Sequence, residues 1–122
     1  MVETAALPEG TKRHDPEVVK NFLATALIRA GVKPDDADLV SDVLVGADLR
    51  GVRSHGAARL SYFIVRLEKG TLNLNPKMDI KMNTKTTGLL DAEDGIGIIA
   101  ANKAMQKSLE IAEEYGTGFI GV

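Results

Sequence analysis

Three apolar stripes with helical spacing, each ended by a glycine, fill the chain between residues 15 and 70. The first begins at Asp15-Pro16-Glu17, where an aspartate N-cap, a proline in the first turn and an acid near the positive end of the helix dipole favour a helix start. Gly31 is the expected end. The apolar side chains recur every three or four residues and predict one core-facing stripe: Val19, Phe22, Leu23, Ala26, Leu27 and Ala30.

Two more helices are expected on the same grounds. One begins at Pro34-Asp35-Asp36 and stops at Gly51, with its stripe at Val40, Val43, Leu44 and Ala47. Ser54 is the expected N-cap of the next, which stops at Gly70 and has its stripe at Leu60, Phe63, Ile64 and Leu67. The connections are short, so the sequence predicts a helical subdomain over residues 15–74, preceded by a flexible tail over residues 1–14.

The pattern changes after Pro76. Apolar Met78, Ile80 and Met82 alternate with polar residues, which is typical of a half-buried strand, and Thr86 to Asp91 is the next expected strand. A fourth helix is expected from about Gly97 to Tyr115, with its core side at Ile98, Ala101, Met105, Leu109 and Ala112. The last four residues predict a buried strand. Because such a strand needs neighbours, we expect the chain to be truncated at Val122.

These elements predict an α+β fold. The helical subdomain is followed, over residues 75–122, by the beginning of a mixed α/β core. The only aromatic residues in the chain are Phe22, Tyr62, Phe63, Tyr115 and Phe119. Aromatic side chains supply much of the buried area in small cores, so this chain is expected to rely on a partner subunit or on further chain.

Composition excludes several classes of protein. No apolar run approaches the ~20 residues that cross a bilayer, and the first residues lack the apolar stretch of a secretory signal. The absence of cysteine removes thiol chemistry and is compatible with a cytoplasmic location. Fifteen basic and seventeen acidic residues, with no basic block, argue against a nucleic-acid partner.

The segment from Arg50 to Arg59 carries the candidate chemistry. On a helix that starts after Ser54, His55 and Arg59 share a face, and Tyr62 continues it. An imidazole transfers protons near neutral pH, and a guanidinium holds a carboxylate through two hydrogen bonds. The pair suits a small acid with a hydroxyl or carbonyl beside its carboxylate. A solvated helix face is the alternative, and His14 is interpreted as an ordinary surface residue.

A second motif runs from Gly95 to Ala100 and matches G-x-G-x-x-A, the glycine pattern of dinucleotide-binding folds. The acidic residue expected ~20 positions later, at the end of a second parallel strand, is missing. A tight turn with close packing is therefore favoured over a phosphate contact. The acids Asp91, Glu93 and Asp94 are interpreted as helix-capping groups, and no metal site is expected.

The run Ala47-Asp48-Leu49-Arg50-Gly51-Val52-Arg53-Ser54-His55-Gly56, with Arg59, Leu60 and Tyr62 after it, resembles the signature of the malate/L-lactate dehydrogenase family. That family includes sulfolactate, ureidoglycolate and 2,3-diketo-L-gulonate oxidoreductases. The stretches from Leu90 to Gly97 and from Gly118 to Val122 are similar to it as well, so the resemblance covers about residues 16–122.

The resemblance implies an oxidoreductase that transfers a hydride between NAD or NADP and a small 2-hydroxy or 2-oxo acid such as malate or lactate, on a fold unlike the Rossmann type. It implies proton transfer by His55 and binding of the substrate carboxylate by Arg59. Arg50 and Ser54 match motif positions that orient the site, and Tyr62 matches an aromatic near the substrate.

Family enzymes are longer, and the resemblance places most cofactor contacts beyond Val122. The isolated chain is therefore expected to be inactive, and a homodimer is implied. Two other interpretations stay open at this point: a non-catalytic helical assembly or partner-binding module, and a true dinucleotide-binding half. The first predicts that His55 and Arg59 lie flat on a surface, and the second requires a parallel strand beside the turn at Gly95.

Overall fold

The computed structural model describes residue 10 and residues 12–122. Most of the expected flexible tail, residues 1–9 and 11, lies outside the described residues. No helix in the described part of the chain has both the length and the apolar character needed to cross a membrane. The elements, in chain order, are α1 (Pro16–Arg29), α2 (Pro34–Leu49), the 3-10 turns η1 (Arg53–His55) and η2 (Ala57–Arg59), α3 (Leu60–Glu68), β1 (Ile80–Met82), β2 (Thr87–Leu90), α4 (Gly97–Tyr115) and β3 (Phe119–Gly121).

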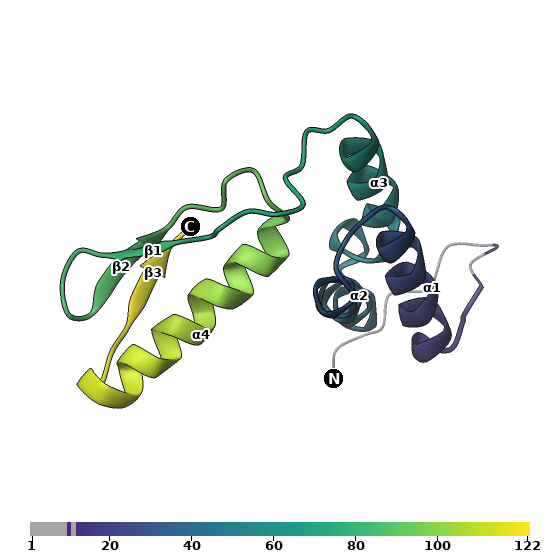
Figure 1. Ribbon diagram of the computed structural model, residues 1–122. Helices are drawn as coiled ribbons and strands as arrows, with labels where there is room; N and C mark the ends of the chain where they lie inside the picture. The colour runs from purple at the N-terminus through teal and green to yellow at the C-terminus, as the bar shows by residue number, and fades with distance from the viewer. Residues whose placement is uncertain (1–9, 11) are drawn as a thin grey trace, which may run out of the picture.

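The three N-terminal helices gather at one end of the molecule, and α4 with the sheet forms the other end (Figure 1). An extended segment between α3 and β1 joins the two ends. The predicted α+β class is confirmed by this arrangement. The division of the chain into domains at residue 74 stays a prediction.

Helix α1 starts and stops as predicted. The Asp15 side chain accepts a hydrogen bond of 2.8 Å from the backbone N–H of Glu17, and Pro16 occupies the first turn. Gly31, just after the helix, has a φ of +99°, a left-handed conformation that a side chain disfavours. Local sequence therefore sets both ends of α1.

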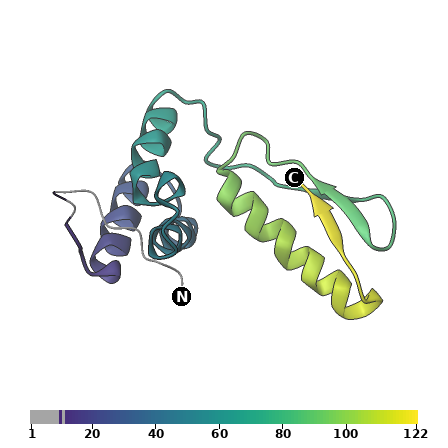
Figure 2. The ribbon, with the colours of Figure 1, turned by 180° about the vertical axis from the view of Figure 1, so that it is seen from behind.

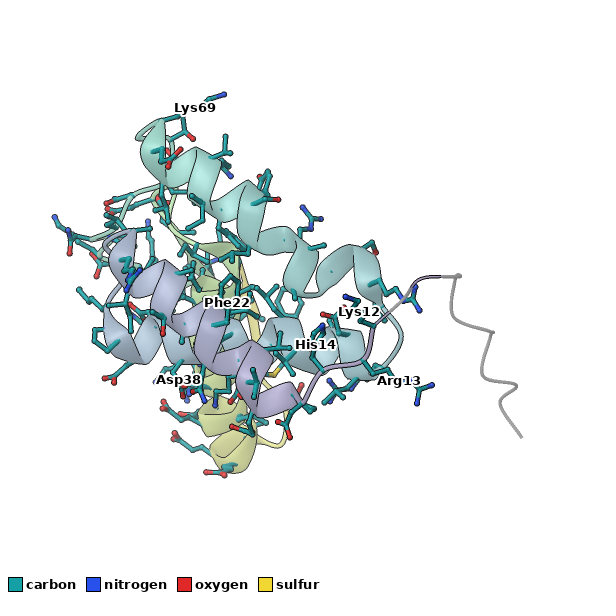
Figure 3. The ribbon with its side chains drawn as sticks, turned by 90° about the vertical axis from the view of Figure 1, so that its right-hand side faces the viewer. Lys12, Arg13, His14, Phe22, Asp38 and Lys69 are labelled. Atoms are coloured by element: carbon teal, nitrogen blue, oxygen red, sulfur yellow. The ribbon has the colours of Figure 1, made fainter. Side chains whose placement is uncertain are left out.

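The helical core is built from the predicted stripes with two corrections. Its fully buried side chains include Leu23, Leu27 and Leu44. Phe22 and Val43 were also expected inside, but they are 65% and 44% exposed. Each of the three short helices is covered by the others on one side only, so a wide apolar stripe is buried only in part. Figure 3 shows Phe22 midway along α1 at the helical end of the molecule.

The sheet has the order β1-β2-β3. Strands β1 and β2 form an antiparallel hairpin in which Ile80 pairs with Leu90. Strand β3 runs parallel to β2, with Gly88 opposite Ile120, and α4 makes the crossover between them. Figure 2 shows α4 from behind, extended beside the sheet. The strands lie near their predicted positions, although Met78 is outside β1 and is buried in a left-handed conformation with a φ of +52°. The prediction that residues 119–122 are buried is wrong for Phe119 and Val122, which are 67% and 64% exposed; Ile120 alone is buried.

The predicted core side of α4 is wrong. Helix α4 spans the predicted residues, but it buries Ala100, Ala104 and Ile111, whereas Met105 and Leu109 are 60% and 57% exposed. Both sides of this helix carry apolar residues. The two alanines are small, so they allow the α4 backbone to lie close to the sheet, where the second hydrophobic cluster contains Met78, Leu90 and Ile120.

The two ends of the molecule meet at the N-terminus of α4. Ile96 belongs to the helical cluster, and Ile99 packs against both clusters. The backbone N–H of Asn73 donates to the carbonyl of Asp94 at 2.9 Å, and the Asn73 side chain donates to the carbonyl of Glu93 at 3.1 Å. The segment after α3 is thereby attached to the turn that precedes α4, and this turn lies beside the helical unit.

Candidate active site

The loop that carries His55 does not follow the predicted helix. Residues 53–55 form one 3-10 turn, Gly56 is extended with a φ of −91° and a ψ of −155°, and a second 3-10 turn precedes α3. Ser54 is therefore not an N-cap; its hydroxyl bonds to the ring of His55. Asp48 instead accepts a 2.8 Å hydrogen bond from the backbone N–H of Ala57. This contact from α2 accompanies the break at Gly56.

Despite the break, the predicted side chains meet at one cavity. His55, Arg59 and Tyr62 line a space of about 390 Å³ between the helical unit and the N-terminus of α4. This space is large enough for a small carboxylic acid. The other lining residues are Leu44, Phe63, Arg66, Leu72, Gly95, Gly97 and Ile98. A shared cavity is the arrangement that the enzyme interpretation requires, and it differs from the flat surface expected of a partner-binding module.

Arg59 is held at the cavity by two contacts. Its Nε donates to the carbonyl oxygen of Ser54 at 3.0 Å, and its guanidinium carbon lies 5.4 Å from the centre of the Tyr62 ring. The two terminal Nη atoms make no hydrogen bond with any residue in 12–122. They therefore remain available for an end-on pair of hydrogen bonds to a carboxylate.

His55 is oriented by its neighbour in the sequence. The Ser54 hydroxyl and His55 Nδ1 lie 2.9 Å apart, which leaves Nε2 without a hydrogen-bond partner in the described part of the chain. A hydroxyl can donate to or accept from an imidazole nitrogen. The serine is therefore compatible with both neutral tautomers. In the tautomer protonated at Nδ1, Nε2 can accept a proton, and the resulting imidazolium can return it.

Tyr62 lies between two arginines. Arg66 donates from Nη1 to the Tyr62 hydroxyl at 2.9 Å and from Nη2 to the carbonyl of Thr71 at 2.9 Å, and its guanidinium lies 5.5 Å from the centre of the ring. The ring also packs edge-on against Phe63. Arg66 thus fixes the Tyr62 hydroxyl while Thr71 holds its other Nη atom.

Two predicted site residues, Ser54 and Arg50, do not line the cavity; Ser54 bonds to both His55 and Arg59, whereas Arg50 bonds to neither. Its Nη1 donates to the carbonyl of Gly46 at 2.9 Å, so the side chain turns back along α2. It is absent from the residues that line the cavity. The local role of Arg50 is therefore to satisfy a carbonyl near the C-terminal end of α2.

The glycine motif at residues 95–100 forms part of the same cavity wall. A Cβ at Gly95 would lie 2.7 Å from both Pro76 and Met78, so close packing explains this glycine. A Cβ at Gly97 would meet nothing within 4 Å. Strand β3 supplies the parallel strand that a dinucleotide-binding half requires. The place of Gly97 beside His55 and Arg59 was not predictable from the motif, because the two segments are about forty residues apart in the sequence.

The acids near this motif accept hydrogen bonds from the backbone around the turn before α4. Asp91 accepts a hydrogen bond from the backbone of Glu93 at 2.9 Å, and the Glu93 carboxylate accepts one from the backbone of Lys77 at 2.8 Å. The expectation that these acids cap α4 is wrong, because the N-cap residue is Ile96 and no side chain makes the capping hydrogen bond. In residues 12–122 no three His, Asp or Glu side chains converge as metal ligands would.

Comparison with known proteins places these residues in context. The sequence profile of the family described as malate/L-lactate dehydrogenase matches residues 14–122. The chain is 33% identical over 122 residues to a malate dehydrogenase from Pyrococcus abyssi, which covers 100% of this chain and 34% of that protein. It is 36% identical over 107 residues to an L-sulfolactate dehydrogenase from Methanocaldococcus jannaschii, covering 86% of this chain and 30% of that protein.

A solved structure agrees with the sequence comparison. The malate dehydrogenase from Pyrococcus horikoshii superposes with a TM-score of 0.92 at 32% identity, covering 98% of this chain and 34% of that one. The chain thus spans about a third of the length of these relatives. Because the profile covers nearly the whole chain and the fold agrees with it, the chain belongs to the malate/L-lactate dehydrogenase family.

Proposed function

We propose that this chain supplies the substrate-binding and proton-transferring side of an oxidoreductase that interconverts small 2-hydroxy and 2-oxo acids with NAD or NADP. The observation that carries the proposal is the cavity of about 390 Å³ at which His55, Arg59 and Tyr62 meet. The relatives support it, since they are named for malate and sulfolactate, which both carry a carboxylate beside the hydroxyl-bearing carbon.

Arg59 binds the carboxylate. Its Nε is occupied by the Ser54 carbonyl, and its Nη atoms are open toward a ligand. An end-on pair of hydrogen bonds fixes the plane of the carboxylate and thereby the position of the neighbouring carbon. Tyr62, packed against the same guanidinium, limits the directions in which Arg59 can turn.

His55 transfers the hydroxyl proton. During oxidation its Nε2 takes the proton from the substrate hydroxyl, and during reduction it returns a proton to the carbonyl oxygen. Ser54 accepts a hydrogen bond from Nδ1–H, 2.9 Å away, in both directions, because Nδ1 stays protonated while Nε2 gains or loses the proton. Ser54 is thus an orienting residue, and Arg50 has no place in this arrangement.

A nicotinamide cofactor, when bound, supplies the two-electron acceptor or donor for the hydride. The described residues fit one wall of its site: Gly97 opens on the cavity with no atom where a side chain would lie. The family resemblance places most cofactor contacts beyond Val122. We therefore assign most cofactor contacts to segments outside this chain, and we expect the isolated chain to be inactive.

The proposal includes three further points that follow from the family resemblance or the sequence. The enzyme is a homodimer, it is cytoplasmic, and residues 15–74 form a helical subdomain separate from residues 75–122. The two hydrophobic clusters support the last point, although Ile96 and Ile99 bridge them.

The proposal is tested by NMR titration of the isotopically labelled chain with oxamate, a 2-oxo-acid mimic. We expect the His55 ring and the Arg59 Nε–H resonances to shift together with a single dissociation constant. Arg59→Gln should weaken this affinity at least tenfold, because it removes the charged pair of donors. Arg29→Gln, an exposed arginine that does not line this cavity, is the matched control. Equal affinities for the two variants would overturn the proposal.

A further inference from the structure

Asp48 makes a contact that neither the motif chemistry nor the cavity explains. It lies in the last turn of α2, and its Oδ2 accepts the backbone N–H of Ala57 at 2.8 Å. The same carboxylate lies directly against Gly56, where an added Cβ would overlap it. Asp48 thus contacts both residues at the break between His55 and Arg59.

Within the loop, one side-chain hydrogen bond links the two turns, from Arg59 Nε to the Ser54 carbonyl at 3.0 Å. The backbone hydrogen bonds of the loop are local: His55 to the carbonyl of Val52 at 3.0 Å, Gly56 to that of Arg53 at 3.2 Å, and Arg59 to that of Gly56 at 2.9 Å. Each one stabilises a single turn. The bond to Asp48 spans nine residues and attaches the start of η2 to a long, well-packed helix.

The absence of a side chain at Gly56 belongs to the same arrangement as the Asp48–Ala57 hydrogen bond. Its φ of −91° is accessible to any residue, so backbone strain does not require glycine there. Glycine instead leaves room for the Asp48 carboxylate, which lies where a Cβ would be and which a larger residue would displace. The close approach brings the carboxylate to the Ala57 N–H and keeps Gly56 extended, which separates the turn that carries His55 from the turn that carries Arg59.

We propose that Asp48 is a positioning residue: through Gly56 and Ala57 it sets the separation and relative orientation of His55 and Arg59 at the cavity, without touching substrate. This inference rests on the proposed function, because it assigns the two side chains to one ligand. Asp48 is charged, and a charged acceptor makes a stronger hydrogen bond to a backbone N–H than a neutral one does.

The first test compares Asp48→Ala and Asp48→Asn in the chain itself, by amide hydrogen exchange and by the side-chain resonances of His55 and Arg59. Asp48→Ala should speed exchange at the Ala57 amide about tenfold or more and move the Arg59 Nε–H resonance, because the bond to Ser54 loosens. Asp48→Asn retains an oxygen acceptor and should recover most of both effects. Asp42→Ala, another exposed acid of α2, should leave both unchanged.

The second test asks whether the steric contact and the hydrogen bond are one device. Gly56→Ala should disturb the Ala57 amide and the Arg59 resonance as much as Asp48→Ala does, since its methyl group displaces the carboxylate. In the double variant the effect should not exceed the larger single effect, because the methyl group no longer meets a carboxylate. Additive effects, or an unchanged Ala57 amide in Asp48→Ala, would overturn the proposal.

Oxamate binding separates this inference from the function on which it rests. We expect Asp48→Ala to weaken oxamate about fivefold or more, while Asp48→Asn stays within about twofold of the unmodified chain. If oxamate binds neither the unmodified chain nor any variant, the proposed function fails, and the exchange and resonance data still decide the positioning role. If oxamate binds and Asp48→Ala leaves its affinity unchanged, the positioning role fails and the proposed function stands.

Discussion

The two ends of the molecule bury their apolar residues in different ways. The helical end packs large side chains, Leu23, Leu27 and Leu44, between three short helices. The sheet end places α4 on a three-stranded sheet through Ala100 and Ala104, and leaves Met105 and Leu109 exposed. Both ends leave some apolar residues exposed, but the helical end buries its large leucines, whereas the sheet end buries small residues of α4.

The two ends also contribute different groups to the cavity. The side chains with acid-base or anion-binding chemistry at the cavity, His55, Arg59, Tyr62 and Arg66, come from the helical end. The sheet end contributes backbone and small or apolar groups, Gly95, Gly97 and Ile98. We therefore expect substitutions at the first end to divide sharply into those that affect stability and those that affect chemistry.

The largest expected effect is on the helical core. Leu27 is fully buried, so Leu27→Ala should lower the free energy of unfolding by about 2–5 kcal/mol. The neighbouring Ile28 is 44% exposed, and Ile28→Ala should cost well under half as much. Urea denaturation followed by circular dichroism measures both. Similar costs at the two positions would show that the helical end does not have the core that its burial indicates.

The next effect is on chemistry. In a chimaera that joins this chain to the remaining two-thirds of the Pyrococcus abyssi malate dehydrogenase, His55→Ala should lower kcat at least ~10²-fold, because general acid-base transfer is lost. His14, the other histidine, lies before α1 and does not line this cavity, so His14→Ala is the control. An unchanged kcat with normal cofactor binding would remove His55 from the mechanism.

A smaller effect tests the sheet end. Ala104 is 3% exposed on the side of α4 that faces the sheet, so Ala104→Leu should overpack this contact and destabilise the chain by about 1–3 kcal/mol. Met105→Leu, on the exposed side, should change stability by less than about 0.5 kcal/mol. Thermal unfolding of both variants provides the measurement. A larger loss of stability in Met105→Leu than in Ala104→Leu would support the core side that the sequence predicted for α4.

Those two positions show where sequence reasoning succeeds and fails. The ends of α4 were predictable because glycines and a change of periodicity mark them locally. The buried side was not, because both sides carry apolar residues and only the sheet, distant in sequence, selects the smaller ones. The prediction that Phe22 and Val43 are buried was wrong for a related reason. A stripe shows which residues are able to face a core, and the number of neighbouring helices decides how many of them do.

At the site, residue types were predictable and the path of the chain was not. An imidazole and a guanidinium four positions apart indicated a shared ligand, and they do line one cavity. The four-residue spacing predicted a continuous helix, but the chain breaks at Gly56 between two 3-10 turns. The contact at this break comes from Asp48, which lies on α2. Arg50 shows the opposite case, since it matches the motif but bonds to its own helix.

The smallest predicted effect concerns the contact between α1 and α2. Lys20 lies 2.8 Å from Asp42 and 3.3 Å from Asp38. The hydrogen bond to Asp42 raises the pKa of Lys20 above its ordinary value of 10.5, against a smaller opposing effect of desolvation and with further support from Asp38. Since the folded pKa exceeds the unfolded one, this pair stabilises the fold fully below pH 10.5 and less as the pH rises through the folded pKa.

Lys20→Met should therefore lower the thermal midpoint slightly at neutral pH, and the difference from the unmodified chain should narrow above pH 10.5. Tyr115 titrates in the same window, because a hydrogen bond with Glu114 raises its pKa, so the comparison is made in a Tyr115→Phe background. Lys107→Met, which removes a pair confined to α4, is the control. A difference that stays constant from neutral to strongly alkaline pH would mean that the α1–α2 contact of the helical end depends on apolar packing alone.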